Sequence, residues 1–464
     1  MLGAIANTFA NCFKIPELKS RIIFTVLLLG ICRIMAWITI PGLDGGALMR
    51  YFDAHAKDIG GSLLGMYSLF TGGAMQHCAV GSLGIMPYIT ATIIVQLLTA
   101  VIPQLSKLAR EEGGRTKLIQ YGRYLTVVLC LIQGAVITFG WEKPGSIDPS
   151  IDKLVLYPAS LIWVYRIQTL LVLTTGTLLL MWLGEQITER GIGNGVSLVI
   201  TIGIVARLPK AFQAMQGMFF ATGDVEAKYN LGHGAALILL LAGVIAGVIA
   251  ITQAQRKVPV QYAQRAVGRK VYSGGTSFMP LRVNYAGVMP IIFAGAILSF
   301  PQKLASGAAS IFKDPFVVNL LNGAARHLTE GAFVYLTIYS VMILFFSYFW
   351  VATQFNELQI ADDLKKNGGY IPGVRPGQAT ADFLHHAMSR ITLAGAVFLT
   401  VIAVIPIILA REMNIPYDVT QFFGGTSMLI TVGVMLDTMR QVESHLMMRH
   451  YDGFLKKGRL RGRF

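Results

Sequence analysis

Residues 60–99 read GGSLLGMYSLFTGGAMQHCAVGSLGIMPYITATIIVQLLT, and their character changes within what should be one passage through a membrane. A short apolar segment bounded by glycines comes first, a polar hinge at 71–77 interrupts it, and a longer apolar run covers 79–102. The first piece is too short to cross about 30 Å of hydrocarbon, which needs about 20 apolar residues in a helix. Because irregular backbone at membrane depth is tolerated only beside protein or a water-filled cavity, the stretch predicts an internal cavity.

The composition is that of an integral membrane protein. Of 464 residues, 54% are hydrophobic and 14% are charged, and the mean hydropathy is +0.58. Ordinary soluble domains carry about 25% charged residues. The first long apolar run, residues 22–40, lacks a small-residue cleavage site and precedes further runs, so it predicts a retained helix rather than a signal peptide. The four cysteines lie far apart and indicate neither a metal site nor a disulfide framework.

Ten apolar runs are long enough, or nearly so, to span a membrane as helices. They cover residues 22–41, 79–102, 121–141, 159–183, 195–208, 234–253, 284–301, 332–353, 390–410 and 420–438. With the N-terminus in the cytoplasm, most lysines and arginines outside the runs fall on the cytoplasmic side. We therefore expect an all-α polytopic membrane protein with ten transmembrane helices and both termini cytoplasmic.

The expected helices divide into two sets of five. An odd number per half would invert one half relative to the other, as in transport folds with a site between inverted repeats. No residue-level similarity between the halves is visible, so the repeat is inferred from topology alone. The expected parts are an amphipathic cytoplasmic segment at 1–20, an N-terminal half at 21–208, a C-terminal half at 209–438 and a basic cytoplasmic tail at 439–464.

Two long cytoplasmic loops, residues 254–283 and 354–390, carry distinct signals. The first alternates apolar and polar residues around 258–262 and 269–272, which predicts a strand-like ribbon, and its basic residues suit an anionic partner surface or lipid headgroups. The second holds IPGVRPG, residues 371–377, whose prolines and glycines predict a fixed turn around Arg375. That turn is interpreted as a docking feature, with an ordinary solvated loop as the alternative.

The apolar runs contain little chemistry. Arg33 lies inside the first run, and the ionisable residues near helix ends are explained by snorkelling or capping. The sequence holds no HExxH, GxSxG or Walker A motif, so we expect no catalytic residue, metal or cofactor, and no enzyme activity. The glycine-rich RGIGNG at 190–195 is interpreted as a helix-start turn capped by Asn194. A cavity without an energy source predicts a passive conduit closed by apolar side chains.

Five motifs stand out along the chain: GIMPYITATIIVQLLT at 84–99, ITERGIGNGVSLVI at 187–200, NYAGVMPIIFA at 284–294, IPGVRPGQAT at 371–380 and FFGGTSMLI at 422–430. Together they resemble the SecY family of bacterial protein-translocation channels, in the same order and at family-like spacing from about residue 16 to the end of the last run. The resemblance implies ten helices in two inverted five-helix halves around an hourglass pore, with a plug helix. It also implies a lateral gate to lipid between the second and seventh helices.

The resemblance assigns roles to particular residues. It implies a pore ring of Ile85, Ile89, Val196, Ile200, Ile292 and Ile430, where Val196 departs from the usual isoleucine and would widen the constriction slightly. It implies a plug of Ser62, Leu63, Leu64, Gly65, Met66, Tyr67, Ser68, Leu69, Phe70, Thr71, Gly72 and Gly73. Gln96 and Asn284 are candidates for a polar contact at the lateral gate, or else are locally satisfied amides. The docking residues for a motor or ribosome are Arg256, Arg269, Lys270 and Arg375.

The function that the resemblance implies is translocation of unfolded secretory polypeptides, recognised by their signal peptides, and release of apolar segments sideways into membrane lipids. The implied partners are SecE, SecG, the SecA ATPase and the ribosome, in a bacterial inner membrane. No motif supports sequence-specific nucleic-acid binding. The main alternative is an inverted-repeat secondary transporter, which the near absence of intramembrane charge disfavours. A membrane enzyme lacks a catalytic constellation, and a structural scaffold would not explain the broken second run.

Overall fold

The chain divides into two compact units. The computed structural model describes the chain outside residues 1–14, 55–67, 69–70, 112, 143–153, 220–230, 263–264, 268–269, 273–275, 296, 299–315, 317–318, 320–322, 324–326, 329–331, 413–418, 420–425 and 458–464. The first unit comprises Met1–Phe220, Pro416–Phe422 and Val434–Phe464, and the second comprises Ala221–Ile415 and Phe423–Gly433. The two halves expected from the sequence, 21–208 and 209–438, stay a prediction.

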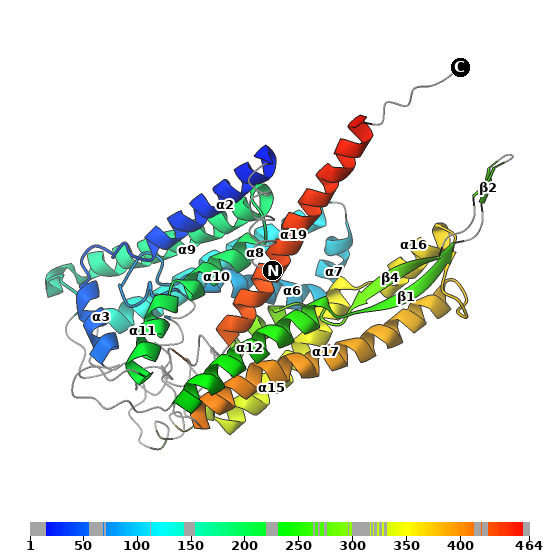
Figure 1. Ribbon diagram of the computed structural model, residues 1–464. Coiled ribbons are helices and arrows are strands. Elements are labelled where there is room, and N and C mark those ends of the chain that lie inside the picture. Colours follow the sequence, from blue (N-terminus) through cyan, green and yellow to red (C-terminus); the bar gives the residue numbers. More distant parts are fainter. Residues whose placement is uncertain are drawn as a thin grey trace. The chain divides into compact units, whose positions relative to one another are not determined.

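The first unit is helical (Figure 1). Its helices are α2 Pro16–Met35, α3 Gly45–Ala54, α6 Met86–Val101, α7 Pro103–Arg110, α8 Gly114–Glu142, α9 Ile162–Arg190, α10 Gly195–Val205 and α11 Leu208–Phe219, with the 3-10 turn η2 at Ala159–Leu161. Helix α9 contacts α2, α6, α8 and α10, so the unit packs around it. Because α2 begins at Pro16, a favoured first-turn residue, residues 16–20 of the predicted surface segment belong to the first helix.

Ion pairs join α8 to α9 near both ends. Arg123 donates two hydrogen bonds to the Glu185 carboxylate, at 3.1 and 2.8 Å, and Arg166 donates two to Glu142, both at 2.8 Å. The Arg166 guanidinium also lies 5.0 Å from the ring centroid of Trp163. Two-point pairing of arginine with a carboxylate fixes geometry as well as charge. Arg166 and Glu185, which we expected to snorkel or to cap a helix, are therefore both in ion pairs.

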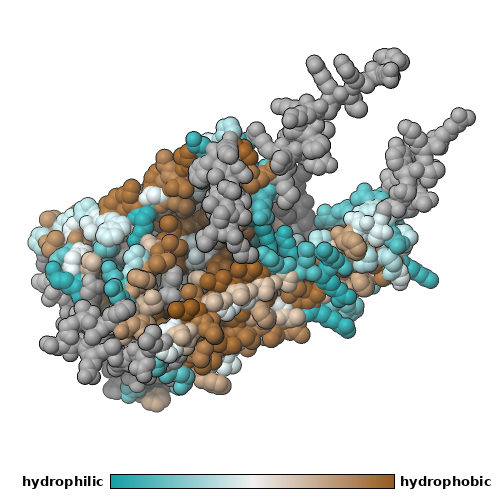
Figure 2. All heavy atoms as spheres, in the orientation of Figure 1, coloured by the Kyte–Doolittle hydropathy of each residue, from teal (hydrophilic) through white to brown (hydrophobic). Residues whose placement is uncertain are grey.

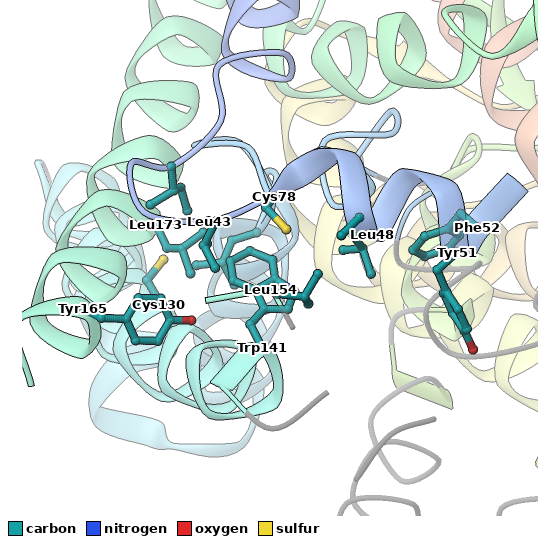
Figure 3. Close-up of a cluster of buried hydrophobic side chains, with 13 residues drawn as sticks. Leu43, Leu48, Tyr51, Phe52, Cys78, Cys130, Trp141, Leu154, Tyr165 and Leu173 are labelled. Carbon is teal, nitrogen blue, oxygen red and sulfur yellow. The ribbon is translucent and has the colours of Figure 1, made fainter. Parts of the chain in front are cut away.

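A buried apolar cluster anchors the segment between α2 and α6. Figure 3 shows Leu43 and Leu48 from the chain around α3, Cys78 from the turns before α6, Cys130 from α8 and Leu173 from α9. All five side chains are buried. The turns and α3 thus pack directly on α8 and α9, which holds an otherwise irregular stretch in place.

The second predicted run is broken where the sequence indicated continuous helix. Residues 71–85 form turns and α6 begins only at Met86, so the prediction of one helix over 79–102 was wrong at its start. Gly84 has a φ of +59°, which side chains disfavour, and Pro87 lies in the first turn, where its missing N–H costs nothing. Pro103 then starts α7, which is bent by 104° from α6.

The second unit combines long helices with a small sheet. Its elements are α12 Leu231–Gln253, β1 Gln255–Tyr262, β2 Arg265–Val267, β3 Lys270–Tyr272, β4 Thr276–Arg282, α15 Phe333–Gln354, α16 Glu357–Lys366, β5 Gly369–Tyr370 and α17 Gln378–Glu412. Helix α17 contacts α12, α15 and α16, and Figure 1 shows α12, α15 and α17 side by side. A further helical stretch occupies residues 289–295. Helix α19, Thr426–Lys457, begins in this unit and continues in the first.

The predicted ribbon in the first long loop is confirmed. Strand β1 pairs antiparallel with β4, from Gln255 opposite Arg282 to Gln261 opposite Thr276, and β2 pairs with β3. The end of β1 also pairs with β5 of the second loop. The alternating pattern indicated β1 and β3 but not β4, whose Pro280 interrupts the polar and apolar alternation. Both loops therefore belong to one structure.

The surface separates apolar helices from a polar end. Figure 2 shows hydrophobic surface over α12, α15 and α17, and hydrophilic surface over the β1–β4 hairpin and α16. By length and composition, the described residues contain six helices that could each cross a membrane, or seven if the bent pair α6–α7 forms one span. Helical residues occur in every one of the ten predicted ranges. The described part of the chain thus agrees with an all-α membrane fold that carries a small sheet in its loops.

Candidate functional site

Ile85 and Ile89 lie at the start of α6 and both are buried. Ile85 is the residue before the helix, and its carbonyl oxygen accepts a hydrogen bond from the Ile89 N–H at 3.2 Å. Ile85 also lines a cavity of about 30 Å³, together with Thr71 from the turns and Val199 and Gly203 from α10. A space of that size can hold a water molecule. The turns, α6 and α10 therefore converge at one small void.

Val196 and Ile200 lie one turn apart on α10, as the sequence predicted. Ile200 is buried at 3% exposure. Val196 is half-buried, and its Cγ2 atom lies 3.6 Å from the point that a Cβ on Gly184 of α9 would occupy. Part of the Val196 side chain thus faces α9. This direction depends on the close crossing of α9 and α10, which the resemblance alone did not indicate.

The RGIGNG turn fastens α10 to three other helices. Its backbone N–H groups donate to side-chain oxygens of Thr25 on α2, Thr188 on α9 and Gln441 on α19, at 3.1, 2.9 and 2.8 Å. Asn194 is the N-cap of α10 and accepts a bond from the Ser197 N–H at 3.3 Å, which confirms the predicted cap. The turn fixes the start of the helix that carries Val196 and Ile200.

Part of the predicted plug is described. Ser68 is helical and fully buried, Thr71 is buried, and Gly72 and Gly73 form a turn. A Cβ on Gly72 would lie 2.7 Å from the Cα of Gly203, so the backbones of the turn and α10 touch. The other predicted plug residues lie outside the described residues: Ser62, Leu63, Leu64, Gly65, Met66, Tyr67, Leu69 and Phe70.

Ile292 and Ile430 are both buried in the second unit. Ile292 lies in the helical stretch at 289–295 and Ile430 lies in α19. A Cβ on Gly433 would approach Val288 Cγ1 to 2.4 Å, so the chain just before Ile292 touches α19 one turn beyond Ile430. Four of the six predicted ring residues thus lie in the first unit and two in the second, and all but the half-buried Val196 are buried.

The predicted gate residues belong to different units. Gln96 is half-buried on α6. Asn284 is half-buried in the chain before the 289–295 helix, although the sequence placed it inside a helix over 284–301. Gly287, with a φ of +63°, turns the chain there. The Asn284 Nδ2 atom is buried and has no hydrogen-bond partner among the described residues.

The two long loops share an apolar core. Val258 and Val260 of β1 pack with Ile371 of the second loop and with Leu384 and Met388 of α17. This core holds the hairpin and the IPGVRPG turn together. The Tyr370 hydroxyl further donates to Gln261 Oε1 at 2.9 Å.

Of the predicted docking residues, Arg256 and Arg375 are exposed on this structure. The Arg375 carbonyl oxygen accepts a bond from Thr380 Oγ1 at 2.9 Å, which confirms a fixed turn that leaves the guanidinium outside. Lys270 lies in β3, and Arg269 lies outside the described residues. Lys257, Arg282 and Lys366 add exposed positive charge to the same unit.

Two arginines that no motif indicated also meet the plug segment. Arg33 Nη1 donates to the carbonyl oxygen of Gly72 at 2.6 Å, and Arg207 donates to the Ser68 hydroxyl. The available signal for Arg33 was its position inside an apolar run, because intramembrane arginines are rare and often functional. The sequence placed Arg33 inside the first run without assigning it a partner, and the structure supplies one in the Gly72 carbonyl oxygen. Arg207 follows α10 in an ordinary helix-end context and gave no such signal.

Comparison with known proteins gives consistent matches along the chain. A protein-family model named SecY matches residues 79–439. Protein translocase subunit SecY of Chlamydia trachomatis is 41% identical over 475 residues, covering 98% of this chain and 99% of the relative. The subunit of the same name from Thermotoga maritima is 41% identical, covering 98% of this chain and 99% of the relative. That of Vibrio cholerae is 40% identical, covering 97% of this chain and 96% of the relative.

Solved structures share the fold. One described as "The structure of a protein conducting channel" matches with a TM-score of 0.60 at 17% identity, covering 91% of each chain. A second, described by its plug domain that stabilises the closed state, matches with a TM-score of 0.56 at 19% identity, also covering 91% of each chain. The fold is therefore that of the helical membrane channels that conduct proteins. The chain belongs to the SecY family.

Proposed function

We propose that this chain is a protein-conducting channel, which passes unfolded secretory polypeptides across a membrane and releases apolar segments sideways into lipid. The observation that carries the proposal is the buried, glycine-rich turn of residues 71–85, which lies against α10 and interrupts a span that hydropathy would make continuous. Irregular backbone at this depth needs protein or a water-filled path beside it. Relatives named as translocase subunits cover almost the whole chain.

The proposed constriction consists of Ile85, Ile89, Val196, Ile200, Ile292 and Ile430. All six are aliphatic, and all but the half-buried Val196 are buried within their own units. Apolar constrictions close by dewetting, because a narrow hydrocarbon-lined space does not hold water or ions. Branched aliphatic side chains can yield around a passing polypeptide without offering it a binding site. The plug, proposed as residues 62–73, would close the same path in the resting state.

The proposed partners follow from the family and from the loop structure. A structural neighbour with a TM-score of 0.56 comes from a canine ribosome-channel complex of the endoplasmic reticulum. By family resemblance we assign SecE, SecG, the SecA ATPase and the ribosome as partners, in a bacterial inner membrane with both termini cytoplasmic. The exposed arginines of the hairpin and the IPGVRPG turn would bind the motor or ribosome, and Gln96 and Asn284 would line the lateral gate.

A secondary transporter is the alternative that the geometry disfavours. Transport coupled to protons or ions uses polar or ionisable groups at mid-membrane. In the described part of the chain, Glu142 and Glu185 are each held by an arginine in a two-point pair near a helix end. Within those same residues no group of acidic, histidine and cysteine side chains could hold a metal ion.

The test is uptake of an unfolded secretory precursor into vesicles that contain the chain and its accessory subunits, measured as protease-protected precursor. We expect motor-driven uptake by the unchanged chain and roughly tenfold weaker uptake by Arg375→Glu, since truncating or reversing a central docking charge commonly costs 1.4 kcal/mol or more. Thermal stability should stay unchanged, because the Arg375 side chain is exposed and makes no ion pair among the described residues.

Arg50→Glu is the matched control, because Arg50 is exposed and only weakly paired, 3.9 Å from Asp44. It should leave uptake unchanged. Absence of uptake by the unchanged chain would refute the channel, whereas normal uptake by Arg375→Glu would refute only the docking role.

A further inference from the structure

The described end of the plug segment is a glycine turn that follows the helical residue Ser68. The Gly73 N–H donates to the Ser68 carbonyl oxygen at 2.8 Å, and Gly72 between them has a φ of +63°. This six-residue bond with a left-handed glycine is the usual way in which a helix stops. Thr71 Oγ1 donates to the same Ser68 oxygen at 3.2 Å. Such ends leave carbonyl oxygens with partial negative charge that attract cations.

Arg33 supplies one cation at this end. It lies in the last turn of α2, and its Nη1 atom donates to the Gly72 carbonyl oxygen at 2.6 Å. The guanidinium is half-buried, makes no ion pair among the described residues, and lies 5.9 Å from the ring centroid of Trp37. A partly buried charge that donates to one carbonyl oxygen depends strongly on that bond. Moving Gly72 away would break this bond.

Arg207 supplies the second cation. It follows α10 and donates to the hydroxyl of Ser68, whose side chain is fully buried. Between the two arginines, the backbone of Gly72 touches Gly203 of α10. Three contacts therefore hold the turn: the Arg33 bond from α2, the Arg207 bond from the end of α10, and the backbone contact with α10.

We infer that Arg33 and Arg207 form a two-point latch that holds the turn of Ser68 and residues 71–73 in the closed position. The pair, here called the arginine latch, acts by positioning the turn and does not contact a substrate. Charge-assisted bonds of this kind are directional and reversible. The guanidinium groups can take up water when the turn leaves, so the latch resists spontaneous opening without preventing it. Its gating role rests on the proposed function, whereas its positioning role stands on the contacts alone.

The position of the turn can be measured independently of transport. A Cβ on Gly84 would lie 3.7 Å from the Cβ of Thr71, within the range that a disulfide requires. In Thr71→Cys with Gly84→Cys, the rate of disulfide formation therefore reports how often the turn occupies its closed position. Cys32 lines the same cavity as Thr71 and Gly84, so the single Thr71→Cys variant gives the background. The single Gly84→Cys variant reports the strain of a side chain at the positive φ of Gly84.

The experiment combines Arg33→Gln with Arg207→Gln in the full complex in vesicles. We expect resting ion leak to rise about tenfold or more as the closed apolar path becomes wetted, and disulfide formation between the two cysteines to slow. Lysine at both positions should restore much of the seal, since each lysine can donate one bond to the same oxygen. The control is Arg21→Gln on α2. The Arg21 side chain makes a long, partly exposed ion pair with Glu17, at 3.9 Å.

Unchanged leak with unchanged disulfide formation would overturn the latch. A higher leak with unchanged disulfide formation would also overturn it, because the arginines would then act elsewhere. The single glutamine variants and the lysine variant keep the test available if the double variant does not fold. If the unchanged chain fails to take up precursor, the proposed function fails, and disulfide formation still decides whether the arginines position the turn.

Discussion

Replacing Ile200 with aspartate is expected to make the resting channel leak ions. Ile200 is 3% exposed on α10, and we place it in the apolar constriction. A carboxylate there would hold water in a space that is closed by dewetting. A reduction of the barrier by about 1.4 kcal/mol already raises a flux about tenfold, so we expect at least that increase in ion leak from vesicles.

Thermal stability distinguishes a constriction from an ordinary core position. Aspartate that faces a channel finds water, so the loss of stability should be small, whereas aspartate in a dry core costs several kcal/mol. Ile200→Leu, which keeps volume and apolarity, is the matched control and should neither leak nor melt early. Severe destabilisation of Ile200→Asp without any leak would place Ile200 in packing between helices and remove it from the ring.

Replacing Gly195 with valine is expected to prevent correct folding of the first unit. A Cβ at Gly195 would lie 1.9 Å from the carbonyl oxygen of Gly184 and 2.8 Å from the Cβ of Ile187, so α10 could not remain against α9. Inserting atoms into a packed interface costs about 1–3 kcal/mol, and more where backbone must move. We expect a fall of stability above that range, seen as loss of protease-resistant protein and a lower melting temperature.

Gly243 provides the matched control for this substitution. It lies in α12, and a Cβ there meets nothing within 4 Å. Gly243→Val should therefore fold and melt close to the unchanged chain. Equal behaviour of the two variants would show that the α9–α10 crossing is not as close as the Gly195–Gly184 contact indicates.

Most of the fold could be predicted because hydropathy identifies the apolar runs that are stable as helices in the hydrocarbon of a bilayer. The run at 234–253 became α12, and the run at 332–353 became α15, with small shifts at the ends. The start of α6 was not predictable from hydropathy, since the turns at 79–85 are as apolar as the helix that follows. Their signals were Gly84 and Pro87, which act through backbone conformation rather than burial.

The candidate site was predictable only in part. Ile85 and Ile200, which motif positions assign to the ring, are buried in the first unit, and the ring itself stays a prediction. The direction of Val196 toward α9 depends on the Gly184 contact, and the pairing of β1 with β4 depends on a partner strand across a turn. A local sequence pattern does not predict such tertiary contacts, because they join residues that are distant in the sequence. The arginine latch was missed for the same reason, because both partners are distant in the sequence.

The most direct measurement follows a stalled secretory chain through the channel by disulfide crosslinking. Cysteine is placed singly at Ile85, Ile200 or Ile430, and a second cysteine is placed in the stalled chain, in reconstituted vesicles. Leu239 on α12 is the control position, because its side chain is 76% exposed on an apolar helix. The account predicts adducts at all three ring positions and none at Leu239. Equal reaction at the control, or translocation without any ring adduct, would contradict a central polypeptide path through these residues.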